Sequence, residues 1–254
     1  MSADHSETVE QFTAQAAGFA HAHSIRDEVA LELLTSVAAV RLADRVLDVA
    51  CGPGLVVCAF AALARHATGI DVTPAMLEQA RRHADELGLE NVSWELGAVP
   101  PLPWPDGSFD VVVSRYAFHH LEDPLAVLRE MVRVCTAGGR VVVCDIAPAP
   151  DKIDAFNEMD NLRDPSHVRA LSLLELRELF AQAGLGEPRL SHYTLDGDVE
   201  SLLARSHPPP GGADGVRSMF TASLEDDHLG VKARREGARI VYSYPIAVLA
   251  ATVA

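Results

Sequence analysis

The sequence predicts an α/β fold built on a doubly wound parallel sheet. Between residues 45 and about 146, five short apolar runs alternate with longer stretches of helical periodicity, and this alternation is typical of βαβ units. Two of the runs, FDVVVS and GRVVVCDI, are continuously hydrophobic. Parallel strands are buried on both faces, so they show unbroken runs of this kind.

The individual strands follow from the apolar runs. They are expected at residues 46–50, 67–70, 92–96, 109–114 and 140–144. Gly138 and Gly139 follow the helical pattern that ends near Cys135. Glycine readily adopts the left-handed conformation that ends a helix, so we expect this pair to end the helix before the last of these strands.

Two helical patterns precede the first strand, within residues 7–40. The second pattern has one apolar face by the i, i+3, i+4 rule, formed by Ile25, Val29, Leu33, Leu34 and Val37. We expect residues 1–40 to form a helical cover on the core.

The chain beyond residue 147 is expected to complete the sheet. Residues 148–171 form a Pro- and Asp-containing insertion that is long for a connection, and we interpret it as a mobile lid. Ser172 and Glu175 form a capping box for a helix that runs to about residue 183, where Gly184 follows. Residues 186–195 and 240–254 read as strands, whereas the Pro- and Gly-rich segment 207–215 is expected to be irregular. No composition shift marks a boundary, so 1–254 is expected to be one domain with its core at 41–147.

Composition and charge exclude several classes of function. The 254 residues are 48% hydrophobic and 22% charged, which excludes a disordered chain. A formal net charge of -15 disfavours nucleic acid and anionic membranes as partners. The four scattered cysteines read as reduced thiols, and the acidic N-terminus lacks the pattern of a signal peptide. We therefore expect a cytoplasmic protein without a membrane span.

The first motif that carries chemistry is VLDVACGPGLV at residues 46–56. A strand that contains Asp48 runs into a turn with Gly52 and Gly54, and a helix follows. Glycines at the carboxyl end of a strand let the backbone approach a ligand closely. The loop lacks the third glycine of a dinucleotide fingerprint, because Val57 stands there. This disfavours a nicotinamide cofactor and leaves a plain βα turn as the alternative.

The second motif is Asp71 at the end of the next strand, in GIDVTPAMLEQA. A carboxylate there can accept hydrogen bonds from both hydroxyls of a ribose. Its alternative role is to stabilise the start of the following helix, but Thr73 and Pro74 already begin that helix adequately. The two motifs together indicate a nucleoside ligand without a phosphate site.

These segments also resemble a known family. VLDVACGPG, GIDVTPAMLEQA, LPWPDGSFDVVVSRYAFHHLEDP and LREMVRVCTAGGRVVVCDIAP occur in the order and spacing of the class I S-adenosylmethionine-dependent methyltransferases. Within that superfamily the chain is most similar to the small-molecule enzymes of the ubiquinone and menaquinone biosynthesis type. The resemblance covers residues 45–147, and more weakly 161–185. It implies a Rossmann-like sheet of seven strands with the last one antiparallel, and S-adenosylmethionine bound across the carboxyl ends of the first strands.

The resemblance also implies which residues bind the cofactor. Ala98 stands where the family usually has an acidic residue that accepts from the adenine amino group, so a backbone carbonyl would have to substitute. The residues expected to contact the methionine, the ribose, the adenine or the underside of the cofactor are Phe19, Asp48, Ala50, Gly52, Gly54, Asp71, Val72, Met76, Gly97, Ala98, Val99, Ser114 and Tyr116.

His119 and His120 are the candidate bases. Methyl transfer to a hydroxyl requires removal of a proton, and histidine titrates near neutral pH. The resemblance places the pair near the transferable methyl, where an acidic residue such as Asp145 assists in some similar enzymes. Packing and helix capping are the alternative role for one of the pair. The turn chemistry of Asp164 and Pro165 leaves His167 as a further candidate in the substrate pocket, and no metal site is expected.

The sequence therefore predicts methyl transfer from S-adenosylmethionine to an oxygen or carbon of a small organic molecule. Quinone-like, aromatic, sugar and natural-product acceptors all remain open, and a second copy of the chain is a further candidate partner. One alternative is an enzyme of the same fold that keeps the cofactor and catalyses a cyclisation or another non-methylating reaction. The other is a non-catalytic binding module, although such a module would not need Asp48, Gly52, Gly54 and Asp71 together.

Overall fold

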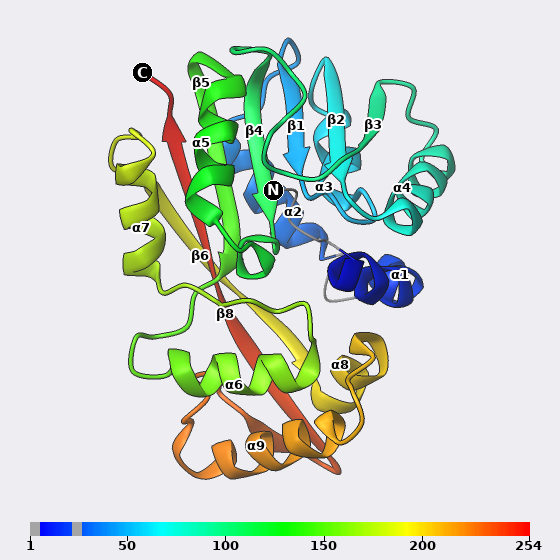
Figure 1. Cartoon of the computed structure of the whole chain (residues 1–254), viewed down its shortest axis with the longest axis vertical. Helices are drawn as coiled ribbons and strands as arrows, with labels where there is room; N and C mark the ends of the chain where they lie inside the picture. Colours follow the sequence, from blue (N-terminus) through cyan, green and yellow to red (C-terminus); the bar gives the residue numbers. More distant parts are fainter. Residues whose placement is uncertain (1–5, 22–26) are drawn as a thin grey trace.

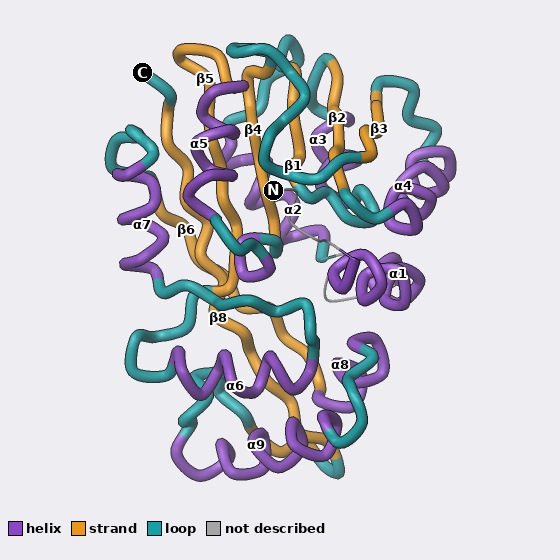
Figure 2. The backbone as a smooth tube through the Cα atoms, in the orientation of Figure 1, coloured by secondary structure: helices purple, strands orange, loops and turns teal. Residues whose placement is uncertain are grey.

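A mixed sheet runs through the whole molecule in the computed structural model, which describes residues 6–21 and 27–254. The strand order is β3-β2-β1-β4-β5-β8-β6, and a short strand, β7, pairs with β8 (Figures 1 and 2). The strands are β1 (Arg45–Val49), β2 (His66–Asp71), β3 (Val92–Leu96), β4 (Phe109–Arg115), β5 (Cys135–Ile146), β6 (Arg189–Asp198), β7 (Arg234–Glu236) and β8 (Arg239–Thr252).

The direction of the strands confirms the predicted topology. Strands β1 to β5 pair in parallel, with Val46 opposite both Ala67 and Val111. Strand β8 is antiparallel to both β5 and β6. It is therefore the reversed strand that the resemblance implied, whereas β7 is an addition that the sequence did not predict.

Helices cover both faces of the sheet. Along β1, Val46 packs into one hydrophobic cluster with α2, α3 and α4, and Leu47 into a second one with α5 and α7. This alternation explains the continuous hydrophobic runs of the strands. The helices are α1 (Ser6–His21), α2 (Glu28–Ala38), α3 (Leu55–Ala61), α4 (Pro74–Glu86), α5 (Pro124–Val134), α6 (Ile153–Arg163), α7 (Leu173–Gln182), α8 (Val199–Ser206), α9 (Gly212–Asp226) and the 3-10 turn η1 (Phe118–His120).

Strands β6 and β8 extend beyond their neighbours, and α6, α8 and α9 pack around the extension (Figure 1). Helix α6 occupies the middle of segment 148–171, which is expected to form a lid. Its residues Ile153, Phe156 and Met159 are buried, and the ring of Phe156 lies 5.4 Å from that of Tyr244. The sequence did not predict this helix, and its hydrophobic side chains belong to the core.

Three local predictions need correction. Val29 is 73% exposed, although the sequence placed it on the apolar face of its helix. Helix α2 buries Leu34 of that face together with Ala30 and Ala38. Ile25 lies outside the described residues. Gly138 does adopt a positive φ, but α5 already ends at Val134 and β5 begins at Cys135. The irregular segment ends earlier than predicted, because α9 begins at Gly212.

Candidate active site

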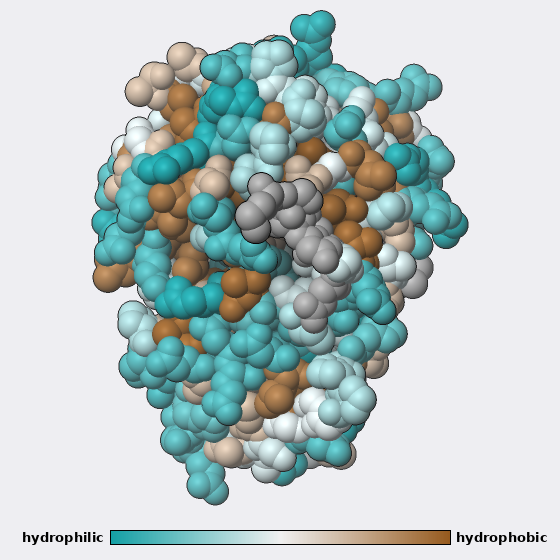
Figure 3. Space-filling view, viewed as in Figure 1, coloured by the Kyte–Doolittle hydropathy of each residue, from teal (hydrophilic) through white to brown (hydrophobic). Residues whose placement is uncertain are grey.

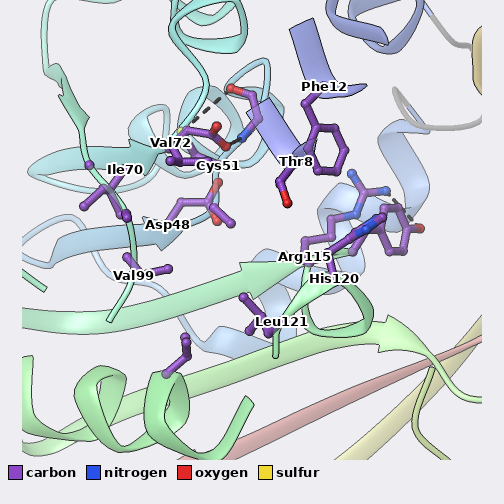
Figure 4. A pocket seen from close by; sticks show the side chains of 18 of the residues that line it. Thr8, Phe12, Asp48, Cys51, Ile70, Val72, Val99, Arg115, His120 and Leu121 are labelled. Carbon is purple, nitrogen blue, oxygen red and sulfur yellow. Dashed lines mark hydrogen bonds between the residues drawn. The ribbon is translucent and has the colours of Figure 1, made fainter. Parts of the chain in front are cut away.

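A pocket with a volume of about 680 Å³ lies at the carboxyl ends of β1, β2 and β4 (Figure 4). Thr8 and Phe12 of α1 form the opposite wall. In the space-filling view, hydrophobic side chains reach the surface between α1 and these strands (Figure 3). The other lining residues are Asp48, Ala50, Cys51, Gly52, Pro53, Leu55, Val56, Ile70, Asp71, Val72, Gly97, Ala98, Val99, Pro100, Pro101, Arg115, Tyr116, Ala117, His120, Leu121, Glu122, Asp123, Val127 and Val168.

The glycine loop between β1 and α3 forms part of the floor. Gly52 lines the pocket and has a φ of 51°. Gly54 has a φ of 77° and does not line the pocket. A Cβ on Gly54 would lie 2.5 Å from the Trp94 ring and 2.7 Å from the Ala80 Cβ. Gly54 is therefore required for packing of the loop on α4 and β3, and its contact with the cofactor stays a prediction.

Asp48 presents an unsatisfied carboxylate to this pocket. Its side chain is 1% exposed, and neither carboxylate oxygen has a hydrogen-bond partner among the described residues. Burial, and then the neighbouring Asp71, raise the pKa of Asp48 well above its usual range, and the Arg115 guanidinium opposes that shift. A buried carboxyl group without partners is costly. The site therefore fits a ligand that brings hydrogen-bond donors, such as the ammonium group of an amino acid.

Asp71 is already part of a hydrogen-bonded framework. Its Oδ2 accepts from the backbone N–H of Gly52 and its Oδ1 from that of Thr73, both at 2.8 Å. Burial raises the pKa of Asp71, while the hydrogen bonds from Thr73 and Gly52 oppose the shift. The sequence argument that left Asp71 spare was thus incomplete. Each carboxylate oxygen has a further lone pair, so the residue can still accept from the hydroxyls of a ribose.

The remaining predicted cofactor residues divide into two groups. Ala50, Val72, Gly97, Ala98, Val99 and Tyr116 all line the pocket. Met76 and Ser114 do not line the pocket. Met76 is on the buried face of α4. The Ser114 hydroxyl donates to the Val49 carbonyl at 2.9 Å. The side chain of Phe19 lies outside the described part of the chain.

Sequence reasoning named Phe19 from α1 but missed Thr8 and Phe12, which form a wall of the pocket. Thr8 and Phe12 are four residues apart, so they lie on the same face of α1 and both reach the pocket. That spacing was the available signal. The sequence did not show that this face of α1 would lie over the ends of the strands rather than on a hydrophobic core.

His120 is the histidine of the pair that lines the pocket. Its Nδ1 lies 2.9 Å from the Ser166 carbonyl oxygen. A carbonyl only accepts, so Nδ1 carries the proton and Nε2 keeps its lone pair. Burial, and then the neighbouring His119, lower the pKa of His120 to about 3, so the ring is neutral at physiological pH.

His119 lies behind His120 and does not line the pocket. Its Nδ1 lies 2.6 Å from Asp145 Oδ1, and the two histidine ring centroids are 4.1 Å apart. Burial acts against the charged ring, but Asp145 outweighs burial and raises the pKa of His119. The structure thus brings the predicted His119 and Asp145 together as a buried pair.

His167 is also buried behind the pocket, so its predicted place in the substrate pocket is wrong. Its Nδ1 lies 3.0 Å from Asp160 Oδ2, and its Nε2 lies 2.8 Å from Asn157 Oδ1. His119, Asp160 and His167 lie close enough together to share a cation. However, Arg163 donates to both carboxylate oxygens of Asp160, at 2.5 and 2.9 Å, and an arginine there competes with a metal ion.

Within residues 6–21 and 27–254, no helix has the length and apolar character needed to cross a bilayer.

Comparisons with known proteins identify the family of the chain. Residues 47–143 match the family model described as a methyltransferase domain. The chain is 37% identical over 193 residues to the uncharacterized methyltransferase YcgJ of Bacillus subtilis, covering 75% of each chain. The crystal structure of YcgJ superimposes with a TM-score of 0.81 at 29% identity, over 88% of this chain and 97% of that one.

A further relative is 27-O-demethylrifamycin SV methyltransferase of Amycolatopsis mediterranei, which is 32% identical over 169 residues, or 63% of this chain and 62% of the relative. The matched family model lies over the strands whose ends form the pocket. The chain therefore belongs to the class I S-adenosylmethionine-dependent methyltransferases and uses S-adenosylmethionine as its cofactor.

Proposed function

We propose that the chain methylates an ionisable hydroxyl group of a small organic acceptor and that His120 is the general base. The observation that carries this proposal is the position of His120 on the pocket wall with Nδ1 bound to the Ser166 carbonyl. This hydrogen bond leaves Nε2 as a proton acceptor. A base is needed when the nucleophile is a hydroxyl, whereas a preionised phenolate needs little help.

The cofactor is expected to be held by the two acidic residues at the ends of β1 and β2. Asp48 is suited to the methionine ammonium, because its oxygens are buried and without partners, and Asp71 to the ribose hydroxyls. The backbone of Gly97 and Ala98 would lie beside the adenine. When bound, the cofactor supplies an electrophilic methyl group on a sulfonium, and the protein has only to align the acceptor with it.

The part of the pocket between α1 and the end of β4 is expected to hold the acceptor. Phe12, Tyr116 and Val168 provide apolar contacts there, and Arg115 brings a buried positive charge. The Arg115 guanidinium carbon lies 4.3 Å from the centroid of the Tyr116 ring. This mixture of aromatic and cationic groups favours a flat acceptor with an ionisable oxygen. The name of the rifamycin-type relative also points to an oxygen acceptor, which supports this choice.

The surroundings of the histidine pair support a division of roles. Asp145 raises the pKa of His119, whereas burial and His119 lower the pKa of His120 to about 3, so the His120 ring is neutral. Two neighbouring groups whose proton affinities are pushed apart are typical of acid–base sites. When His120 accepts a proton at Nε2, the carboxylate of Asp164 favours the charged form of its ring. The carboxylate of Asp145 does the same for the ring of His119.

A screen of small acceptors with S-adenosylmethionine tests the proposal. Each hydroxyl compound is paired with its deoxy analogue, and mass spectrometry detects the added methyl group. We expect methylation only of the hydroxyl compounds. His120→Ala should lower kcat by about 100-fold or more, with little change in affinity for S-adenosylhomocysteine. Full turnover by His120→Ala, or methylation at carbon, would reject the general base and the oxygen acceptor.

A further inference from the structure

Asp164 is buried more deeply than a turn requires. The sequence explains it as the first residue of an Asp-Pro turn, and its Oδ1 does accept from the backbone N–H of Ser166 at 3.0 Å. A turn residue with that single task is usually exposed, because its charge prefers water. Asp164 is only 1% exposed, which indicates a second task.

The other hydrogen bonds of Asp164 lead to the histidine pair. The Ser166 hydroxyl donates to Asp164 Oδ1 at 2.6 Å. The same hydroxyl oxygen lies 3.2 Å from His120 Nδ1, and the Ser166 carbonyl oxygen lies 2.9 Å from it. Because the hydroxyl proton is committed to Asp164, both oxygens of Ser166 present only lone pairs to Nδ1. This arrangement is compatible with a proton on Nδ1 and not with one on Nε2 alone.

We propose that Asp164 is a positioning residue that fixes the tautomer of His120 through the Ser166 hydroxyl. Without the carboxylate, the hydroxyl is free to rotate and donate to Nδ1. That rotation would favour the other tautomer, in which Nε2 carries the proton and His120 cannot act as a base. The catalytic consequence of this inference rests on the proposed function of His120, but the tautomer itself does not.

Helix α1 completes the arrangement from the opposite side. The Gln15 side-chain amide donates to Asp164 Oδ2 at 2.9 Å and to the Ser206 carbonyl at 2.9 Å. The Phe12 ring lies edge-on to His120, with 4.9 Å between centroids. The same helix that forms a wall of the pocket therefore also holds the carboxylate that orients the base.

Charge adds a second effect with a definite sign. Asp164 favours the protonated form of His120, whereas His119 and Arg163 disfavour it. Loss of the Asp164 charge therefore lowers the proton affinity of His120 and weakens it as a base. The charged or titratable groups that surround the ring are His119 on η1, Asp145 on β5, Asp160 and Arg163 on α6, Asp164 and His167 in the following turn, and Arg115 on the pocket wall.

The tautomer can be measured without an acceptor. Nitrogen-15 NMR of histidine-labelled full-length protein, saturated with S-adenosylhomocysteine, distinguishes a protonated from an unprotonated ring nitrogen. We expect the Nδ1–H form of His120 in the wild type and in Ser166→Ala, which keeps the carbonyl. Asp164→Ala should populate the Nε2–H form. The double variant Asp164→Ala with Ser166→Ala should restore the Nδ1–H form, because it removes the hydroxyl that rotates.

This rescue separates positioning from general damage to the fold. If Asp164→Ala does not fold, Asp164→Asn is the substitute. Its neutral amide holds the hydroxyl more weakly, so the tautomer should move in the same direction by a smaller amount. An unchanged tautomer in the folded Asp164 variant, or a shift that the double variant does not reverse, would overturn the proposal.

Turnover provides the second measurement, with an acceptor found in the screen. Asp164→Ala should lower kcat on the order of 10- to 100-fold, as expected for a misplaced catalytic group, and leave KM for S-adenosylmethionine nearly unchanged. Gln11→Ala is the matched control, because Gln11 lies on the same helix and donates to the Ser206 carbonyl but, among the described residues, not to Asp164, and it should retain wild-type kcat. If His120→Ala keeps full turnover while the tautomer responds to Asp164, the proposed base has failed and the positioning effect stands.

Discussion

His119 and His120 are adjacent in sequence, and their ring centroids lie 4.1 Å apart, yet their surroundings move their pKa values in opposite directions. Both rings are buried. Asp145 raises the pKa of His119, whereas burial and the charge on His119 lower that of His120 to about 3. The result is a neutral His120 ring on the pocket wall beside a His119 ring that Asp145 makes easier to protonate.

This pair predicts the pH profile. The pKa of His120 is depressed, so the ring stays unprotonated from about pH 5 to pH 8. For an alcohol acceptor, kcat/KM should therefore show no acid limb near pH 6.5, which is the usual histidine range. His119→Gln removes a group that lowers the pKa of His120, so this pKa should rise and the acid limb should move to higher pH. A wild-type limb near pH 6.5 would contradict the assignment.

Binding of the cofactor product should release a proton from Asp48. Burial raises the pKa of this carboxyl group, so it is protonated in the free protein at pH values below that raised pKa. The ammonium group of S-adenosylhomocysteine favours the carboxylate and lowers the pKa again. Calorimetry in buffers of different ionisation enthalpy should detect the released proton, and affinity should increase with pH. Asp48→Asn should abolish the release; equal proton release by this variant would exclude Asp48 as its source.

Asp71→Ala should weaken binding of S-adenosylhomocysteine by about 1.5 to 3 kcal/mol, because hydrogen bonds to a charged group are lost. This corresponds to about 10- to 100-fold in Kd. Isothermal titration calorimetry provides the measurement. Asp71 also holds the backbone of Gly52 and Thr73, so circular dichroism must first show that the variant is folded. Unchanged affinity in a folded variant would reject the ribose contact.

The two loop glycines should respond differently to alanine. Gly54→Ala combines a positive φ with a Cβ placed 2.5 Å from Trp94, and overpacking of this kind typically costs about 1 to 3 kcal/mol beyond the backbone strain. Gly52→Ala has only the strain, because nothing lies within 4 Å of its Cβ, and we expect a cost of about 1 kcal/mol. Thermal unfolding of both variants tests the order. Equal losses would contradict the packing role of Gly54.

The sheet could be predicted because its signals are local. The apolar runs of β1, β2, β4 and β5 indicate strands buried on both faces, and Asp48, Gly52 and Asp71 lie where parallel strands end. Val29 shows where this reasoning fails. Val29 falls at the helical spacing of the apolar residues of α2 but is exposed. The spacing identifies one face of the helix and does not say which part of that face contacts the core.

The acceptor side could not be predicted from the sequence for a related reason. In the sequence, His119 and His120 were both candidate bases, and His167 was a further candidate in the substrate pocket. Only the folded backbone turns His120 towards the pocket. The sequence assigned Asp164 to the turn that it begins with Pro165. Its hydrogen bonds in the structure come from Gln15, which is 149 positions away, and from the Ser166 hydroxyl, which is two positions away. Such contacts leave no periodic signal.

The two walls of the pocket have separate origins in the chain. The cofactor side consists of strand ends and the loops that follow them, whereas α1 and the turn after α6 lie outside that framework and meet over the histidine pair. A change in either of these two segments can reshape the space for an acceptor without displacing Asp48 or Asp71. The space for an acceptor can therefore be changed by exchange of these two segments. Chimaeras should replace α1 and the 164–169 turn together, because this keeps the two partners of the Gln15–Asp164 contact matched.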